Sequence, residues 1–159
     1  MTTSLLWKVR SFHQLNVFEL QAIYRLRQEV FVVEQQCAYL DADGKDQFAD
    51  HIFGVDDDGR VMAYCRVVQP GISCSEVSIG RVVTHPELRH TGLGKSVMER
   101  AFKCVDDRYG KVPVRIEAQL YLKAFYEQQG FEPVGDVFLL DGIDHIEMLR
   151  PAEGQFSRV

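Results

Sequence analysis

The sequence predicts a mixed α/β domain built around one central sheet, and three observations support this fold class. Segments of alternating apolar residues, typical of strands, are interspersed with segments whose apolar residues recur at helical spacing. The length of 159 residues suits one domain. A hydrophobic content of 46% with 26% charged residues is ordinary for a globular chain and unlike a disordered one. We therefore expect one domain over residues 1–150 and a C-terminal tail over 151–159.

A strand and a helix are expected first. The strand covers residues 6–9. Asn16 then has the position of a helix N-cap, and Glu19 stands at the third position of a capping box. Apolar residues recur at helical spacing after them, which predicts a helix over residues 17–31. The following segment, 37–50, is acidic and irregular.

Three strands are expected next. Residues 52–55 and 61–68 predict two strands joined by the turn Asp56–Gly59, because glycine tolerates the positive φ that such turns need. Residues 77–84 predict the third strand. The residues expected on one face of it are Val77, Ile79, Arg81 and Val83.

The second half alternates helices and strands. An amphipathic apolar stripe predicts a helix from Leu93 to Val105. Alternating apolar residues predict a strand over 114–118. A short helix over 121–129 is expected to end at Gly130, which suits a C-cap, and a last strand is expected over 145–149.

Composition excludes several classes of protein. The net charge of -5 disfavours a general nucleic-acid or anionic-membrane binder. No apolar stretch approaches the roughly 20 residues that span a bilayer, and no export signal is recognised. The four cysteines form no C-x-x-C pair, so we expect free thiols in a reducing cytoplasm. The spacing from Asp41 to Asp46 fails that of a calcium loop, and no metal is expected. A monomer or a homodimer is expected.

The most informative segment joins the third strand to the amphipathic helix. Its turn is Arg89-x-x-Gly92-x-Gly94, in which both glycines let the backbone approach a ligand closely. The first N–H groups of the following helix have no intrahelical partner, and with the helix dipole they form an anion site suited to a pyrophosphate. Arg89 and Lys95 add positive charge. The patterns of a Walker loop and of a Rossmann fingerprint are absent, whereas a purely structural turn remains an alternative.

These residues resemble a known family. Arg89–Gly94 resembles the Q/R-x-x-G-x-G/A signature of the GNAT N-acetyltransferases, and Val82–Thr84 resembles the strand with which those enzymes hold pantetheine. Phe125–Phe131 resembles the family's later F-Y-x-x-x-G-F element. Residues 27–35 and 141–146 resemble the ElaA-like branch. The resemblance implies the acyl-CoA N-acyltransferase fold, with a single, mostly antiparallel sheet splayed between its fourth and fifth strands and flanked by helices.

The resemblance also implies the chemistry. Acetyl-CoA is the implied cosubstrate, and its acetyl group passes directly to a primary amine of a small-molecule acceptor. The N–H of Val83 or a neighbour is the implied donor to the thioester oxygen. The implied cofactor-binding residues are Val82, Val83, Thr84, Arg89, His90, Thr91, Gly92, Leu93, Gly94, Lys95, Gln119 and Phe125.

Tyr126 is the implied general acid, because a phenol is protonated at neutral pH and can donate to a thiolate. The alternative is that Tyr126 only packs in the core. The general base is open, since Ile79 stands where many relatives have a glutamate. Glu117 and His145 are the principal candidates, with Glu34 and His51 as others. Glu117 would instead serve as a partner of Arg115, and His145 as a hydrogen-bonded strand-edge residue.

The sequence leaves alternatives open for the nature of the acceptor and for the activity. The aspartates of the segment 37–50 would form an acidic rim that attracts a cationic amine, or only a solvated loop; they are Asp41, Asp43, Asp46 and Asp50. A non-catalytic CoA-binding GNAT module is the second functional hypothesis. The stretch from Arg27 to Phe31 is faintly similar to acyl-homoserine-lactone synthases, which gives a third.

Overall fold

One open sheet organises residues 4–152, the part of the chain that the computed structural model describes. The strand order is β1-β2-β3-β4-β5-β8-β6, with β7 paired to β8, and all neighbouring pairs are antiparallel except β4 with β5. The strands are β1 (Leu6–Ser11), β2 (Ala49–Val55), β3 (Val61–Val68), β4 (Val77–Thr84), β5 (Val114–Gln119), β6 (Glu132–Pro133), β7 (Phe138–Leu140) and β8 (Ile143–Arg150).

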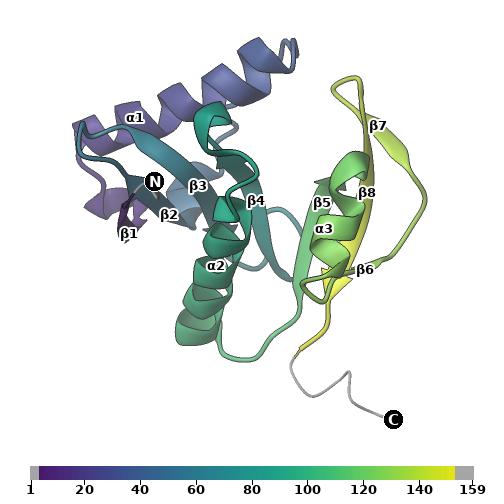
Figure 1. The fold of residues 1–159 in the computed structure, drawn as a ribbon. Coiled ribbons are helices and arrows are strands. Elements are labelled where there is room, and N and C mark those ends of the chain that lie inside the picture. Colours follow the sequence, from purple (N-terminus) through teal and green to yellow (C-terminus); the bar gives the residue numbers. More distant parts are fainter. Residues whose placement is uncertain (1–3, 153–159) are drawn as a thin grey trace.

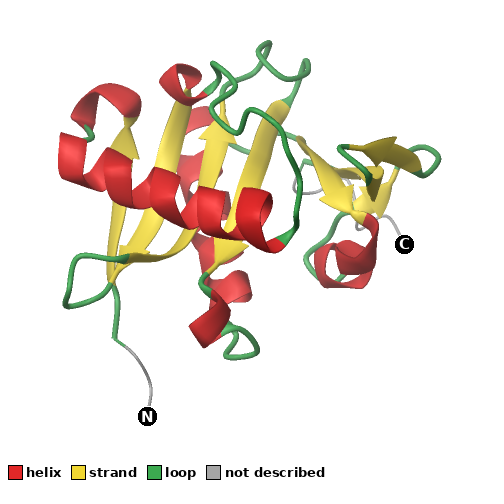
Figure 2. Cartoon of the chain, turned by 90° about the horizontal axis from the view of Figure 1, so that it is seen from above, coloured by secondary structure: helices red, strands yellow, loops and turns green. Residues whose placement is uncertain are grey.

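Helices cover both faces of the sheet (Figure 2). The α-helices are α1 (Val17–Arg27), α2 (Leu93–Tyr109) and α3 (Lys123–Glu127), and α1 continues as the π-helix η2 (Gln28–Glu34). The short 3-10 turns are η1 (Phe12–Gln14), η3 (Asp46–Phe48), η4 (Pro86–Leu88) and η5 (Leu120–Leu122). Two buried apolar clusters follow from this layering. The larger joins α2 and α3 to the sheet, and the smaller joins α1 to the opposite face.

Most of the predicted elements are confirmed. The strands 61–68 and 77–84 match β3 and β4, and Gly59 closes the hairpin before β3 with φ 81°. The Asn16 side chain caps α1 by accepting a hydrogen bond from the Glu19 amide at 2.8 Å. The first helical segment extends three residues beyond the predicted end and changes to a π-helix at its last turns. The strands β6 and β7 were not predicted, because they are two and three residues long.

The expected single face of β4 is wrong. Val77 and Ile79 pack in the cluster under α2, whereas Val83 packs in the cluster under α1. The cause is a β-bulge: Tyr64 pairs with Val83 and Arg66 with Gly80, so β4 carries one residue more than β3 over this stretch. An extra residue reverses the alternation of side chains beyond it.

The sheet opens between β4 and β5. These parallel strands pair only at Val77 with Val114 and at Ser78 with Arg115, and Figure 1 shows them diverging beyond that point. On its other edge, β5 pairs along its whole length with β8. The expected splay between the fourth and fifth strands is therefore present. The tail expected after residue 150 lies outside the described residues from position 153 onward.

Candidate active site

The splay leaves two strand edges facing each other without a shared ladder. On β4 the edge toward β5 has no register partner after Ser78. Arg81 and Val82 lie in the bulge and have no register partner on β3 either. Backbone N–H and C=O groups require hydrogen-bond partners, so an exposed edge of this kind can pair with an extended ligand. The candidate residues Val82, Val83 and Thr84 all lie on this part of β4.

The start of α2 has the features of an anion site. Gly92 is its N-cap with φ 83°, and no side chain caps the first turn. A Cβ built on Gly92 meets no atom within 4 Å, so the space in front of the helix start is open. The first amides of a helix have no intrahelical partner and favour negative charge. These features fit the pyrophosphate site expected from the sequence, which stays a prediction.

Phe125 lies against the same helix start. A Cβ built on Gly94 would stand 3.4 Å from Cζ of Phe125, which is a close contact. The absence of a side chain at Gly94 thus lets α3 approach the first turn of α2. The candidate residues from the two sequence motifs, far apart in the chain, come together at this point. His90 has φ 63° and Thr91 donates its hydroxyl to the Leu88 carbonyl at 2.6 Å, so these residues shape the turn.

The two cationic candidates at the helix start differ in their surroundings. Both Nη atoms of Arg89 donate to the carboxylate oxygens of Glu34, at the end of η2. This hydrogen-bonded pair holds the pKa of Glu34 below its usual value and raises that of Arg89. Lys95 is exposed in the first turn of α2. Arg89 therefore links the turn to η2, and a phosphate at this site would share it with Glu34.

Tyr126 is both a packed residue and a candidate acid. Its ring contacts Phe125 and Phe131, with centroids 5.0 and 5.8 Å away, and only 6% of the residue is exposed. Its hydroxyl forms no hydrogen bond within residues 4–152, and the hydroxyl oxygen is not completely enclosed by other atoms. Burial raises the pKa of the phenol, so it stays protonated at neutral pH. The hydroxyl is thus free to donate to a ligand.

His145 and Gln119 lie on the opposite face of the second half of the sheet. They are register partners on β8 and β5. The Nδ1–H of His145 donates to the Ile143 carbonyl at 2.7 Å, which leaves the lone pair on Nε2 to accept a proton. The Gln119 amide exchanges hydrogen bonds of 3.2 and 3.3 Å with Gln35, next to η2. This contact joins the two halves of the molecule across the splay.

Glu117 does not pair with Arg115, contrary to the alternative considered from the sequence. Arg115 donates instead to Glu76 and Glu147, and Glu117 is exposed on β5 opposite Glu147. Within residues 4–152, no ion pair of Glu117 is found. Its carboxylate is therefore accessible.

His51 cannot serve as the general base. Its Nε2–H donates to the Asp46 carbonyl at 2.9 Å, and its Nδ1 accepts from the Tyr64 hydroxyl at 2.7 Å. The residue is fully buried, and burial lowers the pKa of its ring. Both nitrogens are thus used in the fold. Glu34 is bound by Arg89, which leaves His145 and Glu117 as the candidates with a free acceptor.

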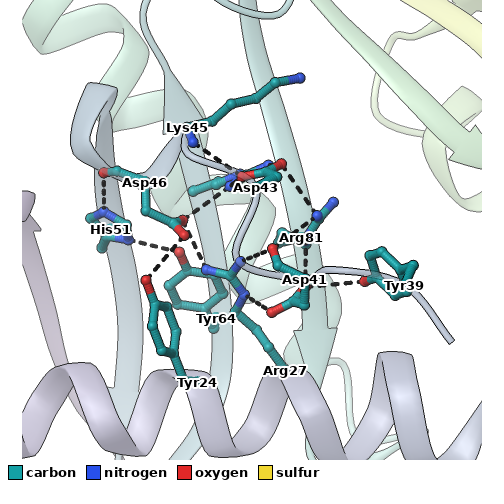
Figure 3. Close-up of polar contacts among 11 residues, drawn as sticks. Tyr24, Arg27, Tyr39, Asp41, Asp43, Lys45, Asp46, His51, Tyr64 and Arg81 are labelled. Carbon is teal, nitrogen blue, oxygen red and sulfur yellow. Dashed lines mark hydrogen bonds and ion pairs between the residues drawn. The ribbon is translucent and has the colours of Figure 1, made fainter.

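The acidic segment is neither an attracting rim nor a solvated loop. Asp41, Asp46 and Asp50 are all buried. Three arginines bind Asp41, Asp43 and Asp46 in the network of Figure 3, and Arg108 of α2 pairs with Asp50 at 3.2 Å. Within that network, Arg27 of α1 donates to Asp41 and Asp46, and the other arginine contacts come from Arg66 of β3 and Arg81 of β4. The expectation of unpaired negative charge is wrong, because arginines far apart in sequence neutralise it.

One sequence signal could have indicated this network. Arg27 stands on the apolar side of the first helix, four residues after Ile23 and three before Val30, both of which are buried. A cation on an apolar helical face needs a buried acidic partner, because an unpaired buried charge is very costly. The sequence did not indicate two contacts made by the segment after η2. Gln35 exchanges hydrogen bonds with Gln119 of β5, and the Cys37 thiol donates to the Asp141 carbonyl at 2.9 Å.

The chain matches the family model of the acetyltransferase (GNAT) domain over residues 16–150. It belongs to the GNAT acetyltransferase family. Protein ElaA of Escherichia coli is 38% identical over 146 residues, which cover 91% of this chain and 95% of ElaA. The crystal structure of that ElaA superimposes with a TM-score of 0.87 over 92% of this chain and 99% of the other, at 36% identity. The resemblance to the ElaA-like branch of the GNAT family is therefore confirmed.

Two further solved structures are informative. An acyl-CoA N-acyltransferase from Pseudomonas aeruginosa has a TM-score of 0.87 at 40% identity, covering 92% of this chain and 99% of the other. The CoA-dependent acyl-homoserine lactone synthase BjaI has a TM-score of 0.75 at 16% identity, covering 97% and 85%. At that identity the likeness to BjaI concerns the fold alone.

No helix within residues 4–152 has the length and apolar content to cross a membrane. The same residues contain no group of three or more histidine, cysteine, aspartate or glutamate side chains arranged to hold a metal ion.

Proposed function

We propose that this GNAT protein is an N-acetyltransferase that passes the acetyl group of acetyl-CoA directly to a primary amine. The observation that carries the proposal is the uncapped start of α2 beside the splay between β4 and β5. The open space at Gly92 and the close contact of Gly94 with Phe125 suit a pyrophosphate held by backbone amides. The free edge of β4 suits the extended amide groups of a pantetheine arm.

The transfer forms a C–N bond to the amine and breaks the C–S bond of the thioester. Charge develops on the thioester oxygen, and we assign its hydrogen-bond donor to the backbone of the β4 bulge, where Arg81 and Val82 have no register partner on β3 or β5. The Tyr126 hydroxyl donates its proton to the sulfur that leaves. This role is supported by its free hydroxyl and by the burial that keeps it protonated.

The amine must lose a proton during the transfer. We assign this proton to Nε2 of His145, whose Nδ1–H is fixed by the Ile143 carbonyl. Ile79, which occupies the position of the usual glutamate, is buried in the core and cannot accept a proton. Glu117 is the second candidate, because its carboxylate is exposed on the neighbouring strand. A His145→Gln variant that retains full activity would transfer the assignment to Glu117.

The test measures release of free thiol from acetyl-CoA over a panel of primary amines, with calorimetric titration of CoA in parallel. Binding of CoA together with amine-dependent thiol release is the expected result. CoA binding with no release over the whole panel would favour the non-catalytic module instead. Failure to bind CoA at millimolar concentration would contradict the proposal altogether. Longer acyl-CoA thioesters in the same assay would test the preference for acetyl.

A further inference from the structure

The bulge of β4 contains an arginine in an unusual backbone conformation. Arg81 has φ 51°, in the left-handed region that residues with a Cβ rarely adopt. It follows Gly80, which pairs with Arg66 on β3. It precedes Val82, whose side chain packs against the apolar cluster under α2. Such a conformation persists only where the surrounding structure holds it. The sequence has glycine at the preceding position, but the strained position itself carries a long side chain.

The side chain of Arg81 is fixed by the segment that follows η2. Its Nε donates to Oδ1 of Asp41 at 2.8 Å, and its Nη2 donates to the Asp41 carbonyl at 3.2 Å and to Asp43 at 3.3 Å. Its guanidinium carbon lies 5.5 Å from the ring centroid of Tyr39. Figure 3 shows these groups converging on Arg81. The tether therefore uses one edge of the guanidinium group, formed by Nε and Nη2.

Asp41 is itself held from the other side. Arg27, which is fully buried in α1, donates from Nε to Oδ2 of Asp41 at 2.8 Å and from Nη2 to its carbonyl at 2.9 Å. The Tyr39 hydroxyl donates to Oδ1 at 3.0 Å. The carboxylate and the carbonyl of Asp41 thus each accept from α1 and from the bulge. A rigid connection runs from Arg27 through Asp41 to Arg81.

The bulge is also the part of β4 that borders the splay. Arg81 and Val82 have register partners on neither β3 nor β5. If Arg81 were extended and in register, the backbone of this stretch would pair with β3, and Val83 would return to the face of Val77. The position of the backbone groups of residues 81 and 82 therefore follows from the left-handed conformation at Arg81, whose side chain is held by the contacts with Asp41.

We infer that Arg81 is a positioning residue, whose guanidinium, anchored on Asp41, holds the β4 bulge so that its backbone can donate to the thioester oxygen. This inference rests on the proposed acyl transfer. Arg81 itself does not touch the reacting atoms. The cradle for the pyrophosphate lies in a separate turn, at Arg89–Lys95, and does not include Arg81. Loss of the tether therefore affects turnover more than CoA affinity.

The experiment compares Arg81→Ala with Arg81→Gly. Both remove the guanidinium, but only glycine adopts the left-handed conformation without strain. We expect Ala to lower kcat at least about 10-fold, below the roughly 100-fold loss typical when an oxyanion donor is removed. We expect Gly to recover most of that loss. The Kd of CoA, measured by calorimetry, should rise by a smaller factor than the fall in kcat, because the pyrophosphate cradle stays intact and only the proposed pantetheine contacts on β4 are disturbed.

Asp41→Asn and Arg60→Ala are the companion variants. The asparagine substitution keeps the size of the Asp41 side chain and weakens its contacts with both arginines, so kcat should fall in the direction of the alanine variant. Arg60 is bound to Asp56 at 2.9 Å in the hairpin before β3 and to Glu87 of η4 at 3.6 Å, and neither partner belongs to the network of Asp41 and Arg81. Its replacement removes an ion-paired arginine without touching the bulge, and kcat should stay within about twofold of the parent.

A readout without catalysis separates this inference from the proposed function. NMR chemical shifts report the backbone conformation of residue 81 in the ligand-free protein. We expect a left-handed residue 81 in the parent and the glycine variant, and an extended one in the alanine variant. A bulge that survives unchanged in Arg81→Ala would overturn the inference. Equal loss of kcat in the alanine and glycine variants would also overturn it, since a general structural anchor predicts that result. Absent acyl transfer with the expected shifts would count only against the proposed function.

Discussion

Replacing Gly92 with aspartate tests the anion site directly, because the structure separates its effects on stability and on binding. With φ 83°, a residue with a Cβ at this position costs about 1–2 kcal/mol of backbone strain. A carboxylate at a helix N-terminus stabilises the folded state by about 0.3–1 kcal/mol, which offsets part of this strain. No atom lies within 4 Å of the added Cβ, so no steric term is added. We expect Gly92→Asp to fold, with a free energy of unfolding lowered by about 1 kcal/mol.

The effect on CoA binding should be much larger. A carboxylate about 4 Å from a phosphate charge is repelled by about 4 kcal/mol at an effective dielectric constant near 20. Since 1.4 kcal/mol corresponds to a factor of ten, the Kd of CoA should rise on the order of a hundredfold to a thousandfold. Titration calorimetry at low and at physiological salt measures this change, and salt should weaken it.

Two control variants isolate the charge. Gly92→Asn has nearly the same volume, tolerates the left-handed conformation and carries no charge, so its Kd should rise less than about tenfold. Gly110→Asp places the same residue at the other end of α2, where the surroundings are also open, but with φ 82° and ψ -161° it should lower the free energy of unfolding more than Gly92→Asp does. It should leave the Kd unchanged. Equal affinities of the Asp and Asn variants at position 92 would refute a pyrophosphate at this helix start.

Three further predictions concern the acid, the buried ion pairs and the first helix. Tyr126→Phe should lower kcat about 100-fold with the Kd of CoA unchanged, because only the proton donor is removed; unchanged turnover would leave Tyr126 with packing alone. Asp46→Asn should lower the free energy of unfolding by about 3–5 kcal/mol in urea titrations, since Arg27 and Arg66 lose a buried partner; a loss below about 1 kcal/mol would argue against the network. Burial raises the pKa values of Asp43 and Asp46, but their arginine partners outweigh it and hold both below the usual range. Their stabilisation is therefore complete above the unfolded pKa near 3.9 and is lost as the pH falls through the folded pKa values. The free energy of unfolding should therefore decrease as the pH is lowered from about 4, and this decrease should be less steep in Asp46→Asn. Asn16→Ala should cost about 1 kcal/mol and Asn16→Ser much less, because serine keeps the cap.

Local patterns in the sequence were sufficient to predict the elements that form the candidate anion site. Gly92 and Gly94 stand at the start of a helix with a strong apolar stripe, and Asn16 with Glu19 marks the start of another. These signals depend on residues a few positions apart, which lie close together once a helix or a turn forms. The same reasoning predicted the hairpin at Gly59 and the order of strands and helices.

Only the tertiary structure revealed the bulge in β4 and the pairing of the acidic segment with arginines. Alternation of apolar residues assumes one residue per position in the ladder, so it could not reveal the bulge at Arg81 or the reversed face of Val83. The aspartates of residues 41–46 have no arginine nearby in sequence, and their partners come from α1, β3 and β4. Charges on such a segment are indistinguishable from solvated ones until folding brings those strands together, because pairing across the fold depends on distances that the chain order does not contain.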